Sequence, residues 1–147
     1  MGLLRIDAQL TATELDDVDA VASAFSHLLG TTDVVEVTGD RSHHGAELLL
    51  MRASVKRKAD LRTCLGRLGD GLLRTVSEEL DQRLDDSGQV HLRLDLHALV
   101  SGVVRLHSGQ GSMVKIKMKF QSWPGEVLKE VILEELGRTD RAGETNP

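Results

Sequence analysis

The sequence predicts an α+β fold, in which helices pack on one face of a mainly antiparallel sheet. Segments that alternate between apolar and polar residues are mixed with segments whose apolar residues recur at helical spacing. Short polar turns separate several of the strands, which favours hairpins. The predicted order of elements is β-α-β-β-α-α-β-β-β-α, and this mixture is typical of an α+β domain.

In the first third of the chain, residues 3–12 alternate in the manner of a half-buried strand. An amphipathic stripe then predicts a helix that Thr13 opens and Gly30 ends. Residues 34–37 and 46–55 are predicted to be strands, with the loop GDRSHHG between them. The second of these strands has four successive apolar residues, which suits a strand that is covered on both faces.

Residues 56–68 have a helical apolar stripe, and a break is expected near Gly69 because glycine weakens helices. A second helix is predicted to reach Leu84, where the turn DDSG leads into a strand from Val90. An irregular step near residues 97–102 precedes the last two strands.

Those strands are predicted at residues 103–106 and 113–120, and the loop HSGQGS joins them. A final helix is expected to begin at Pro124, with Ser122 as its cap, and to end at Gly137. Its apolar face is formed by Val127, Leu128, Val131, Ile132 and Leu136.

The length of 147 residues suits one domain, predicted at residues 1–137, with a flexible polar tail at 138–147. No apolar stretch approaches the length of a membrane span, and the start of the chain lacks the pattern of a signal peptide. The single Cys64 cannot form an internal disulfide. These features predict a cytoplasmic protein without a membrane partner.

The charge of the chain is unevenly distributed. The formal net charge is −5, which argues against a protein that binds polyanions over its whole surface. Residues 41–74, however, hold eight basic and three acidic residues, and residues 97–120 hold four basic residues and no acidic ones. Such blocks can create a local positive potential on an acidic protein.

The last predicted strand reads MVKIKMKF and carries a stripe of lysines, Lys115, Lys117 and Lys119. Alternate residues of a strand share one face, so the three ammonium groups recur at about 7 Å, a spacing comparable with that of nucleic-acid phosphates. The alternative is that the lysines keep an exposed strand from pairing with another chain.

A second basic block begins at the end of the third predicted strand and continues into the next helix. Its residues are candidates for neutralising phosphates, and the alternative is a solvated helix face. Histidines in the preceding loop are candidates for hydrogen bonds to backbone oxygens, and two arginines nearby in the later strands are further candidates because arginine pairs well with phosphate. Beside the lysine stripe, the predicted RNA-contacting residues are therefore Arg52, Lys56, Arg57, Lys58, His43, His44, Arg93 and Arg105.

The sequence predicts neither a catalytic site nor a metal or cofactor site. The histidines lack the spacing of zinc ligands, and HSGQGS lacks the lysine of a phosphate-binding loop. Cys64 occupies an inward helical position, which is typical of an inert core thiol. Aromatic residues are few, and Trp123 is expected to pack beside the last helix, so contact with the RNA backbone is favoured over base stacking.

Four segments, taken in order, resemble a known family. They are LTATELDDVDAV, SHHGAELLLMRASVKRKADL, LDDSGQVHLRLDLHALVSGVVRL and VKIKMKFQSWPGE, and the resemblance covers residues 3–137. The family is an archaeal RNA-binding family described as a predicted exosome subunit, whose fold is similar to that of the large-subunit ribosomal protein that binds 5S rRNA. In that family the loop that matches His43–Gly45 precedes a strand and a basic helix start, here Lys56–Lys58.

The chain departs from the family pattern after Asp95. The family usually continues with Lys-Gln and an aromatic residue before glycine, where this chain has Leu96, His97 and Val100. The resemblance implies a non-catalytic RNA-binding module, an accessory factor of RNA processing or degradation associated with the exosome. The alternative is a protein-interaction or homodimerisation module that does not bind nucleic acid.

Overall fold

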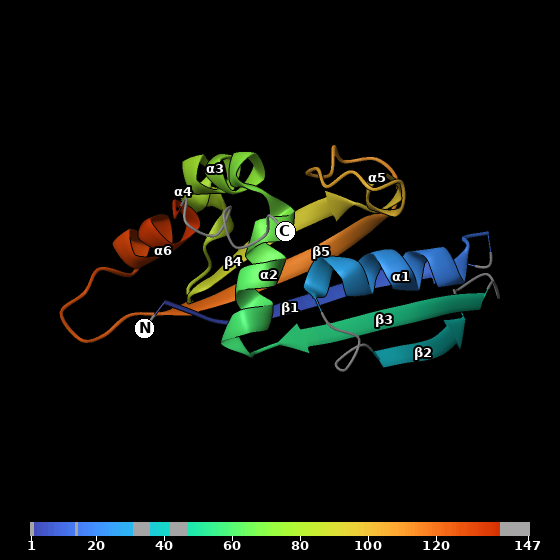
Figure 1. Ribbon diagram of the computed structural model, residues 1–147, viewed down its shortest axis with the longest axis horizontal. Helices are drawn as coiled ribbons and strands as arrows, with labels where there is room; N and C mark the ends of the chain where they lie inside the picture. Colours follow the sequence, from blue (N-terminus) through green and yellow to red (C-terminus); the bar gives the residue numbers. More distant parts are fainter. Residues whose placement is uncertain (1, 14, 31–35, 42–46, 139–147) are drawn as a thin grey trace.

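The protein is built on a five-stranded antiparallel sheet with the strand order β2-β3-β1-β5-β4 (Figure 1). The computed structural model describes residues 2–13, 15–30, 36–41 and 47–138. The predicted α+β class is confirmed. The strands are β1 (Gly2–Thr13), β2 (Glu36–Arg41), β3 (Glu47–Val55), β4 (Gln89–Asp95) and β5 (Met113–Gln121).

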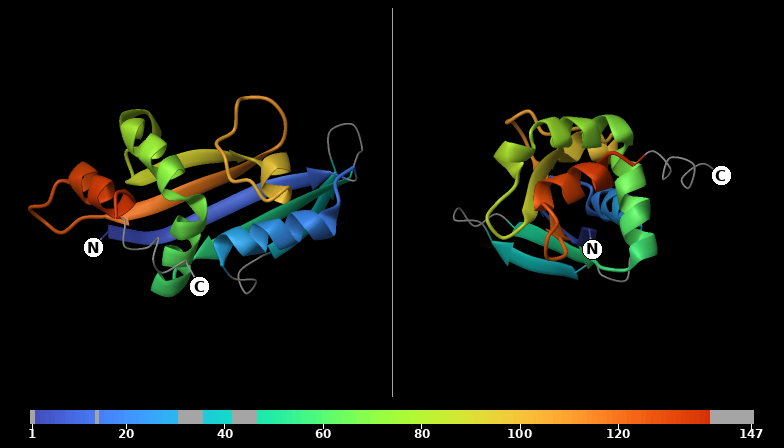
Figure 2. Two further views of the ribbon diagram at one scale, coloured as in Figure 1. Left: turned by 45° about the horizontal axis from the view of Figure 1, so that its top comes forward. Right: turned by 90° about the vertical axis from the view of Figure 1, so that its left-hand side faces the viewer.

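Helices cover one face of this sheet and leave most of the other face open (Figure 2). Their buried residues form one core cluster with the inward side chains of the strands, among them Phe25, Leu65, Leu73 and Ile132. The helices are α1 (Val18–Leu29), α2 (Lys58–Leu68), α3 (Asp70–Glu78), α4 (Leu80–Arg83), α5 (Leu96–Val100) and α6 (Leu128–Leu136).

The two central strands separate apolar from polar residues as the alternation predicts. On β1, Ile6, Ala8 and Leu10 are buried, and on β5 Ile116 and Met118 are buried. The residues between them lie on the opposite face because successive side chains of a strand alternate. Leu4 breaks the predicted pattern: Leu3 pairs with Phe120 and Arg5 with Lys119, so Leu4 is an extra residue at a register shift and is 37% exposed.

The first helix begins later than the sequence predicts. Thr13 remains in β1, and its amide and hydroxyl both donate to the Asp16 carboxylate in a tight turn. Asp17 then caps α1 by accepting a hydrogen bond from the Ala20 amide at 3.2 Å. Gly30 ends the helix in the left-handed conformation, as predicted.

The hairpin of β2 and β3 also differs from the prediction. Strand β2 extends through Thr38–Arg41, which the composition assigned partly to a loop. Leu48 and Leu50 are only half-buried, so β3 is not covered on both faces along its length. The rest of the predicted loop, including His43 and His44, lies outside the described residues.

Residues 103–106 do not form the predicted strand. The amide of His107 donates to the Arg93 carbonyl, and the amide of Asp95 donates to the Arg105 carbonyl, so only Leu106 bridges to Leu94 on β4. Helix α5 occupies the stretch where an irregular step was expected, and Asp95 caps it through the Ala98 amide. The predicted break at Gly69 is confirmed, because Gly69 ends α2 and precedes α3.

The final helix begins at Leu128 rather than at Pro124. A turn precedes it, in which the Glu126 amide donates to the Trp123 carbonyl and the Glu126 carboxylate accepts from the Trp123 amide. Trp123 is 59% exposed, so the expectation that it packs beside the helix is wrong. Gly137 caps the end of α6, as predicted. Of the predicted tail, the structure describes only Arg138.

Candidate nucleic-acid interface

The open face of the sheet carries rows of polar side chains that cross four strands. Gln9 on β1 pairs with Arg52 on β3 and with Lys115 on β5, and Lys115 pairs in turn with Arg93 on β4. The side chains in such a row share a face, and neighbouring strands are about 4.8 Å apart. Three cations that are distant in the sequence therefore stand in one row.

A second row lies two residues further along each strand. Asp7 pairs with Ser54 on one side and Lys117 on the other, and Lys117 pairs with His91. The two rows are about 7 Å apart, which is the distance between alternate residues of a strand. A carboxylate on β1 is thus placed between a serine on β3 and a lysine on β5, and Arg52 lies in the neighbouring row.

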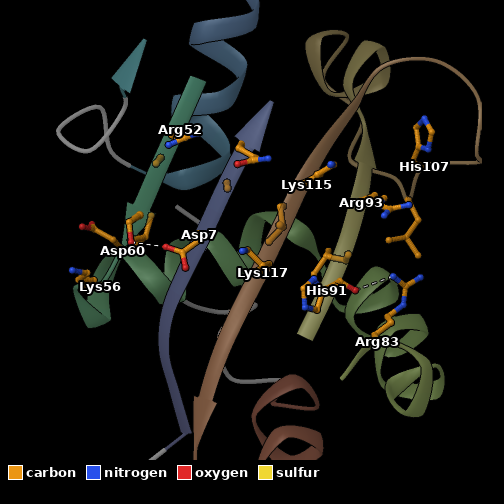
Figure 3. A pocket seen from close by; sticks show the side chains of 18 of the residues that line it. Asp7, Arg52, Lys56, Asp60, Arg83, His91, Arg93, His107, Lys115 and Lys117 are labelled. Carbon is orange, nitrogen blue, oxygen red and sulfur yellow. Dashed lines mark hydrogen bonds between the residues drawn. The ribbon is translucent and has the colours of Figure 1, made fainter. Parts of the chain in front are cut away.

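These rows form the floor of a groove of about 1250 Å³. The beginning of α2 lines one side of it, and α4 and the segment around His107 line the other (Figure 3). Seven lysine and arginine residues line the groove against two aspartates, although the chain as a whole has a net charge of −5. The groove is therefore a local concentration of positive charge. Its basic residues are Arg52, Lys56, Arg57, Arg83, Arg93, Lys115 and Lys117.

Most of these cations line the groove without a charged partner among the described residues. Within the part of the chain that the structure describes, no carboxylate forms an ion pair with Arg52, Lys56, Arg93, Lys115 or Lys117. All five residues are exposed to solvent. An incoming anion can therefore contact them without first displacing an internal ion pair.

Arg57 and Arg83 are held differently. The Nε atom of Arg57 lies 3.8 Å from the Asp60 carboxylate, one helical turn away, but the Arg57 side chain is 80% exposed. Arg83 donates from Nη2 to Glu79 at 2.7 Å and from Nη1 to the carbonyl of His91 at 3.2 Å. These bonds fix the Arg83 guanidinium at the β4 side of the groove.

His91 connects this side of the groove to the turn before β4. Its Nε2 lies 2.6 Å from the Asp85 carboxylate. Hydrogen bonding by the His91 ring, the Gln89 amide and the Ser87 hydroxyl holds the pKa of Asp85 well below its usual value. The Asp85 carboxylate is thus a fixed negative partner for His91, and His91 in turn faces Lys117 across the strands.

Three of the predicted RNA-contacting residues do not line the groove. Lys58 is exposed on α2, outside the lining. Arg105 lies 3.7 Å from Asp95, whose pKa is lowered first by the hydrogen bond from the Ala98 amide and then by Arg105. Lys119 shares the face of Lys117, but its ammonium group donates to the Ser87 carbonyl.

Sequence reasoning did not single out several residues that the fold brings to the groove. Asp7 and His91 lie at polar positions of alternating strands, and their pairing with the lysine stripe depends on a strand order that the sequence does not specify. Arg83 reaches the groove because α4 ends beside β4. His107 reaches it through the backbone bond that ties its amide to Arg93.

Other chemistry has little support among the described residues. They include no group of three or more His, Cys, Asp and Glu side chains that could hold a metal ion. Cys64 is buried, and burial raises the pKa of its thiol to about 12, which agrees with the predicted inert core thiol. None of the described helices is both long and apolar enough to cross a membrane.

The fold and the groove define an α+β protein with an open, basic sheet face. A family model described as RNA binding matches residues 4–120. The chain therefore belongs to this RNA-binding family, and the family assignment supports a role in binding RNA.

Similar proteins come from archaea. The RNA-binding protein PAB1135 of Pyrococcus abyssi is 24% identical over 139 residues, which cover 89% of this chain and 88% of that protein. The structure of Mth689, a DUF54 protein from Methanothermobacter thermautotrophicus, matches with a TM-score of 0.75 at 23% identity. The match covers 92% of this chain and 96% of the Mth689 chain. AF2318 from Archaeglobus fulgidus matches with a TM-score of 0.72 at 19% identity, over 91% of this chain and 99% of the AF2318 chain. The two structures share the fold.

Proposed function

We propose that the protein is a non-catalytic RNA-binding module that holds the phosphate backbone in the groove on its open sheet face. Arg52 and Lys115 in the first row, and Lys117 in the second, are proposed to neutralise phosphates directly. Lys56, Arg57 and Arg93 extend the positive surface to both sides of the groove. His43 and His44, which lie outside the described residues, remain proposed contacts.

One observation carries this proposal. Cations from three separate segments of the chain, at the ends of β3, on β4 and on β5, line the same groove. A single lysine stripe is explained equally well as protection of an exposed strand. That explanation does not apply to β5, which is paired on both edges, and it does not account for the arginines that β3 and β4 add to the same groove.

The groove favours recognition of the backbone over recognition of bases. Its lining contains no phenylalanine, tyrosine or tryptophan among the described residues. Phe25 and Phe120 are buried in the core. Proteins that read unpaired bases stack them on exposed aromatic rings, and the rings in this lining are the His91 and His107 imidazoles, so the groove lacks the larger platforms for stacking.

Titration of a short RNA at several salt concentrations tests the proposal. Each phosphate contact contributes about 0.7 to 0.9 to the slope of log affinity against log salt. The double variant Lys115→Ala/Lys117→Ala is expected to lower the affinity and to reduce this slope by roughly 1.4 to 1.8, the sum for two contacts. Fluorescence polarisation of a labelled RNA measures both quantities.

A matched control removes two positive charges outside the groove. The double variant Lys58→Ala/Arg105→Ala has the same change in net charge, but neither residue lines the groove. It is expected to keep the wild-type slope. Equal losses in the two double variants would mean that RNA responds only to net charge, and the groove assignment would then fail.

The acidic start of α1 supports a second proposal, that the groove binds another copy of the chain. Asp17, which precedes α1, and Asp19, in its first turn, are exposed, and Leu15 nearby is 94% exposed. Static light scattering with and without RNA separates the two proposals. A dimer that RNA dissociates, and that the Lys115→Ala/Lys117→Ala variant does not form, would support docking between copies.

We further propose that the protein acts beside RNA-processing or RNA-degrading proteins such as the exosome. This rests on the family resemblance of the segments that contain Lys56–Lys58 and Lys115–Lys119. Co-purification from a cell that expresses the tagged protein, with and without nuclease treatment, tests it. Exosome subunits recovered only without nuclease would indicate a link through RNA rather than direct contact.

A further inference from the structure

A carboxylate lies in the middle of the proposed phosphate-binding groove. Asp7 is on the central strand β1, between Ser54 on β3 and Lys117 on β5. Among the described residues that line the groove, the other carboxylate is Asp60, which lies at the side beside Arg57 (Figure 3). Asp7 forms an ion pair with Arg5, but its oxygens remain hydrogen-bond acceptors, as phosphate oxygens are, so a groove that selects only for phosphate would be better without it.

The Asp7 carboxylate is held in one orientation. Its Oδ2 accepts a hydrogen bond from Arg5 Nε at 2.8 Å, and its Oδ1 accepts one from the Ser54 hydroxyl at 2.7 Å. Two bonds do not exhaust a carboxylate, which has about four acceptor positions. The Asp7 side chain is 30% exposed, so a ligand in the groove can reach the remaining positions.

An acceptor in this position requires a hydrogen-bond donor from the ligand. Phosphate oxygens at neutral pH are acceptors, and the sugar of DNA has no donor within the chain. The ribose of RNA carries a 2′-hydroxyl in every nucleotide, between successive phosphates, and this group distinguishes RNA from DNA at a given site. Cationic residues on both sides of Asp7, Arg52 in the neighbouring row and Lys117 beside it, would hold the flanking phosphates.

We propose that Asp7 accepts a hydrogen bond from a ribose 2′-hydroxyl, and that it thereby makes the groove selective for RNA over DNA. This inference rests on the proposed function, because it assumes that the backbone lies in the groove. It adds to the proposed function the residue, Asp7, that selects RNA over DNA. Repulsion by Asp7 disfavours a backbone without the hydroxyl, and the hydrogen bond compensates for that repulsion in RNA.

The test compares three forms of one short hairpin sequence: RNA, DNA and 2′-fluoro RNA, which keeps the ribose-like sugar pucker but has no 2′ donor. The wild type is expected to prefer RNA to both other forms. In the Asp7→Asn variant, the preference for RNA over 2′-fluoro RNA is expected to fall about tenfold, as for a hydrogen bond to a charged group. The affinity for DNA is expected to rise in the same variant.

Asp60→Asn is the matched control, because it removes the same charge from the side of the groove. It is expected to raise the affinity for all three forms by a similar factor. If Asp7→Asn also changes all three affinities by one factor, Asp7 acts only through its charge and the inference is overturned. Equal binding of RNA and 2′-fluoro RNA by the wild type overturns it as well, although the proposed function would stand.

A second variant keeps the test decisive if Asp7→Asn does not fold, as judged by circular dichroism. Ser54→Ala removes one of the two bonds that orient Asp7 and leaves every charge in place. It is expected to lower the preference for RNA over 2′-fluoro RNA and to leave the affinity for DNA unchanged. An unchanged preference in Ser54→Ala would then overturn the inference. A wild type that binds none of the three forms would instead disprove the proposed function itself.

Discussion

Lys117 and Lys119 lie two residues apart on the same face of β5, but their ammonium groups have different surroundings. Lys117 lines the groove and has no ion-pair partner within the described chain. Lys119 donates a hydrogen bond to the Ser87 carbonyl, in the turn before β4. The next residue in that turn is Gly88, which has a φ of +83°. A Cβ added to Gly88 would lie 3.6 Å from Lys119 Nζ, so the Lys119 ammonium group is packed closely against the turn. Lys119 therefore closes a turn, whereas Lys117 is available to a ligand.

The first prediction follows from this difference. Lys117→Ala is expected to weaken RNA binding and to reduce the salt slope by about 0.7 to 0.9, the value of one phosphate contact. Lys119→Ala has the same change of charge on the same strand, and is expected to keep the slope and to lower the melting temperature instead. Polarisation titrations and thermal unfolding of both variants check this. A lower slope in Lys119→Ala would show that its bond to Ser87 opens when RNA binds.

The single tryptophan provides a second prediction. Trp123 is exposed but does not line the groove. If RNA is held by its backbone in the groove, saturating RNA is expected to leave the Trp123 fluorescence unchanged. Quenching with the same midpoint as the polarisation signal would instead indicate that a base stacks on the indole ring, and the backbone-only interpretation would be wrong.

The third prediction concerns pH and Asp85. Because hydrogen bonds hold the Asp85 pKa below its unfolded value of about 3.9, the ionised carboxylate stabilises the fold above that pH. This contribution is lost as the pH falls through the lower, folded-state pKa. Asp85→Asn is therefore expected to lower the melting temperature at neutral pH, and the difference from the wild type is expected to shrink below about pH 4. A difference that is constant from pH 7 to acid would contradict this explanation.

Asp86→Asn is the control for the same experiment. Asp86 is the exposed neighbour of Asp85 in the turn. Removal of its charge is expected to leave the melting temperature nearly unchanged over the same pH range. The comparison separates the hydrogen bonds of Asp85 from a general effect of one negative charge.

The elements that the sequence predicts well are those with a strong local signal. The alternation on β1 and β5 is clear because each strand has one buried and one open face, and a shift of one residue would reverse both. The break at Gly69 is predicted because glycine weakens a helix, and the stop at Gly30 because glycine ends helices in conformations that other residues avoid; both residues have a positive φ. Both conformations are present in the structure.

The errors occur where a tertiary contact overrides a local signal. Residues 103–106 have the composition of a strand, but the chain is tied to β4 at one bridge only, after α5 has turned it aside. The groove itself could be predicted only in part. The basic blocks were visible, but the position of Asp7 between Ser54 and Lys117 depends on placing β1 between β3 and β5, which no local pattern specifies.

The last prediction concerns the packing of α1 against α2 at Gly30. This glycine has a φ of +79°, and a Cβ built on it would lie 2.9 Å from Thr63 Cγ2. Gly30→Ala is therefore expected to destabilise the protein by more than the roughly 1–2 kcal/mol of left-handed strain alone. Thr63→Ser removes the crowded methyl group and keeps the hydroxyl that donates to the Ala59 carbonyl. Urea unfolding of the double variant is expected to show less destabilisation than the sum of the two single variants.

Gly71→Ala is the matched control for that cycle. Gly71 lies in α3 and has no positive φ, and a Cβ added there would meet no atom of the described chain within 4 Å. Alanine there is expected to stabilise the protein by roughly 0.4–1 kcal/mol, because it restricts the unfolded chain without straining the folded one. Opposite signs for Gly30→Ala and Gly71→Ala would attribute the loss at Gly30 to its conformation and to Thr63. If the effects of Gly30→Ala and Thr63→Ser on the free energy of unfolding are strictly additive, the contact between the helices adjusts without cost. Backbone strain alone then accounts for the loss of stability in Gly30→Ala.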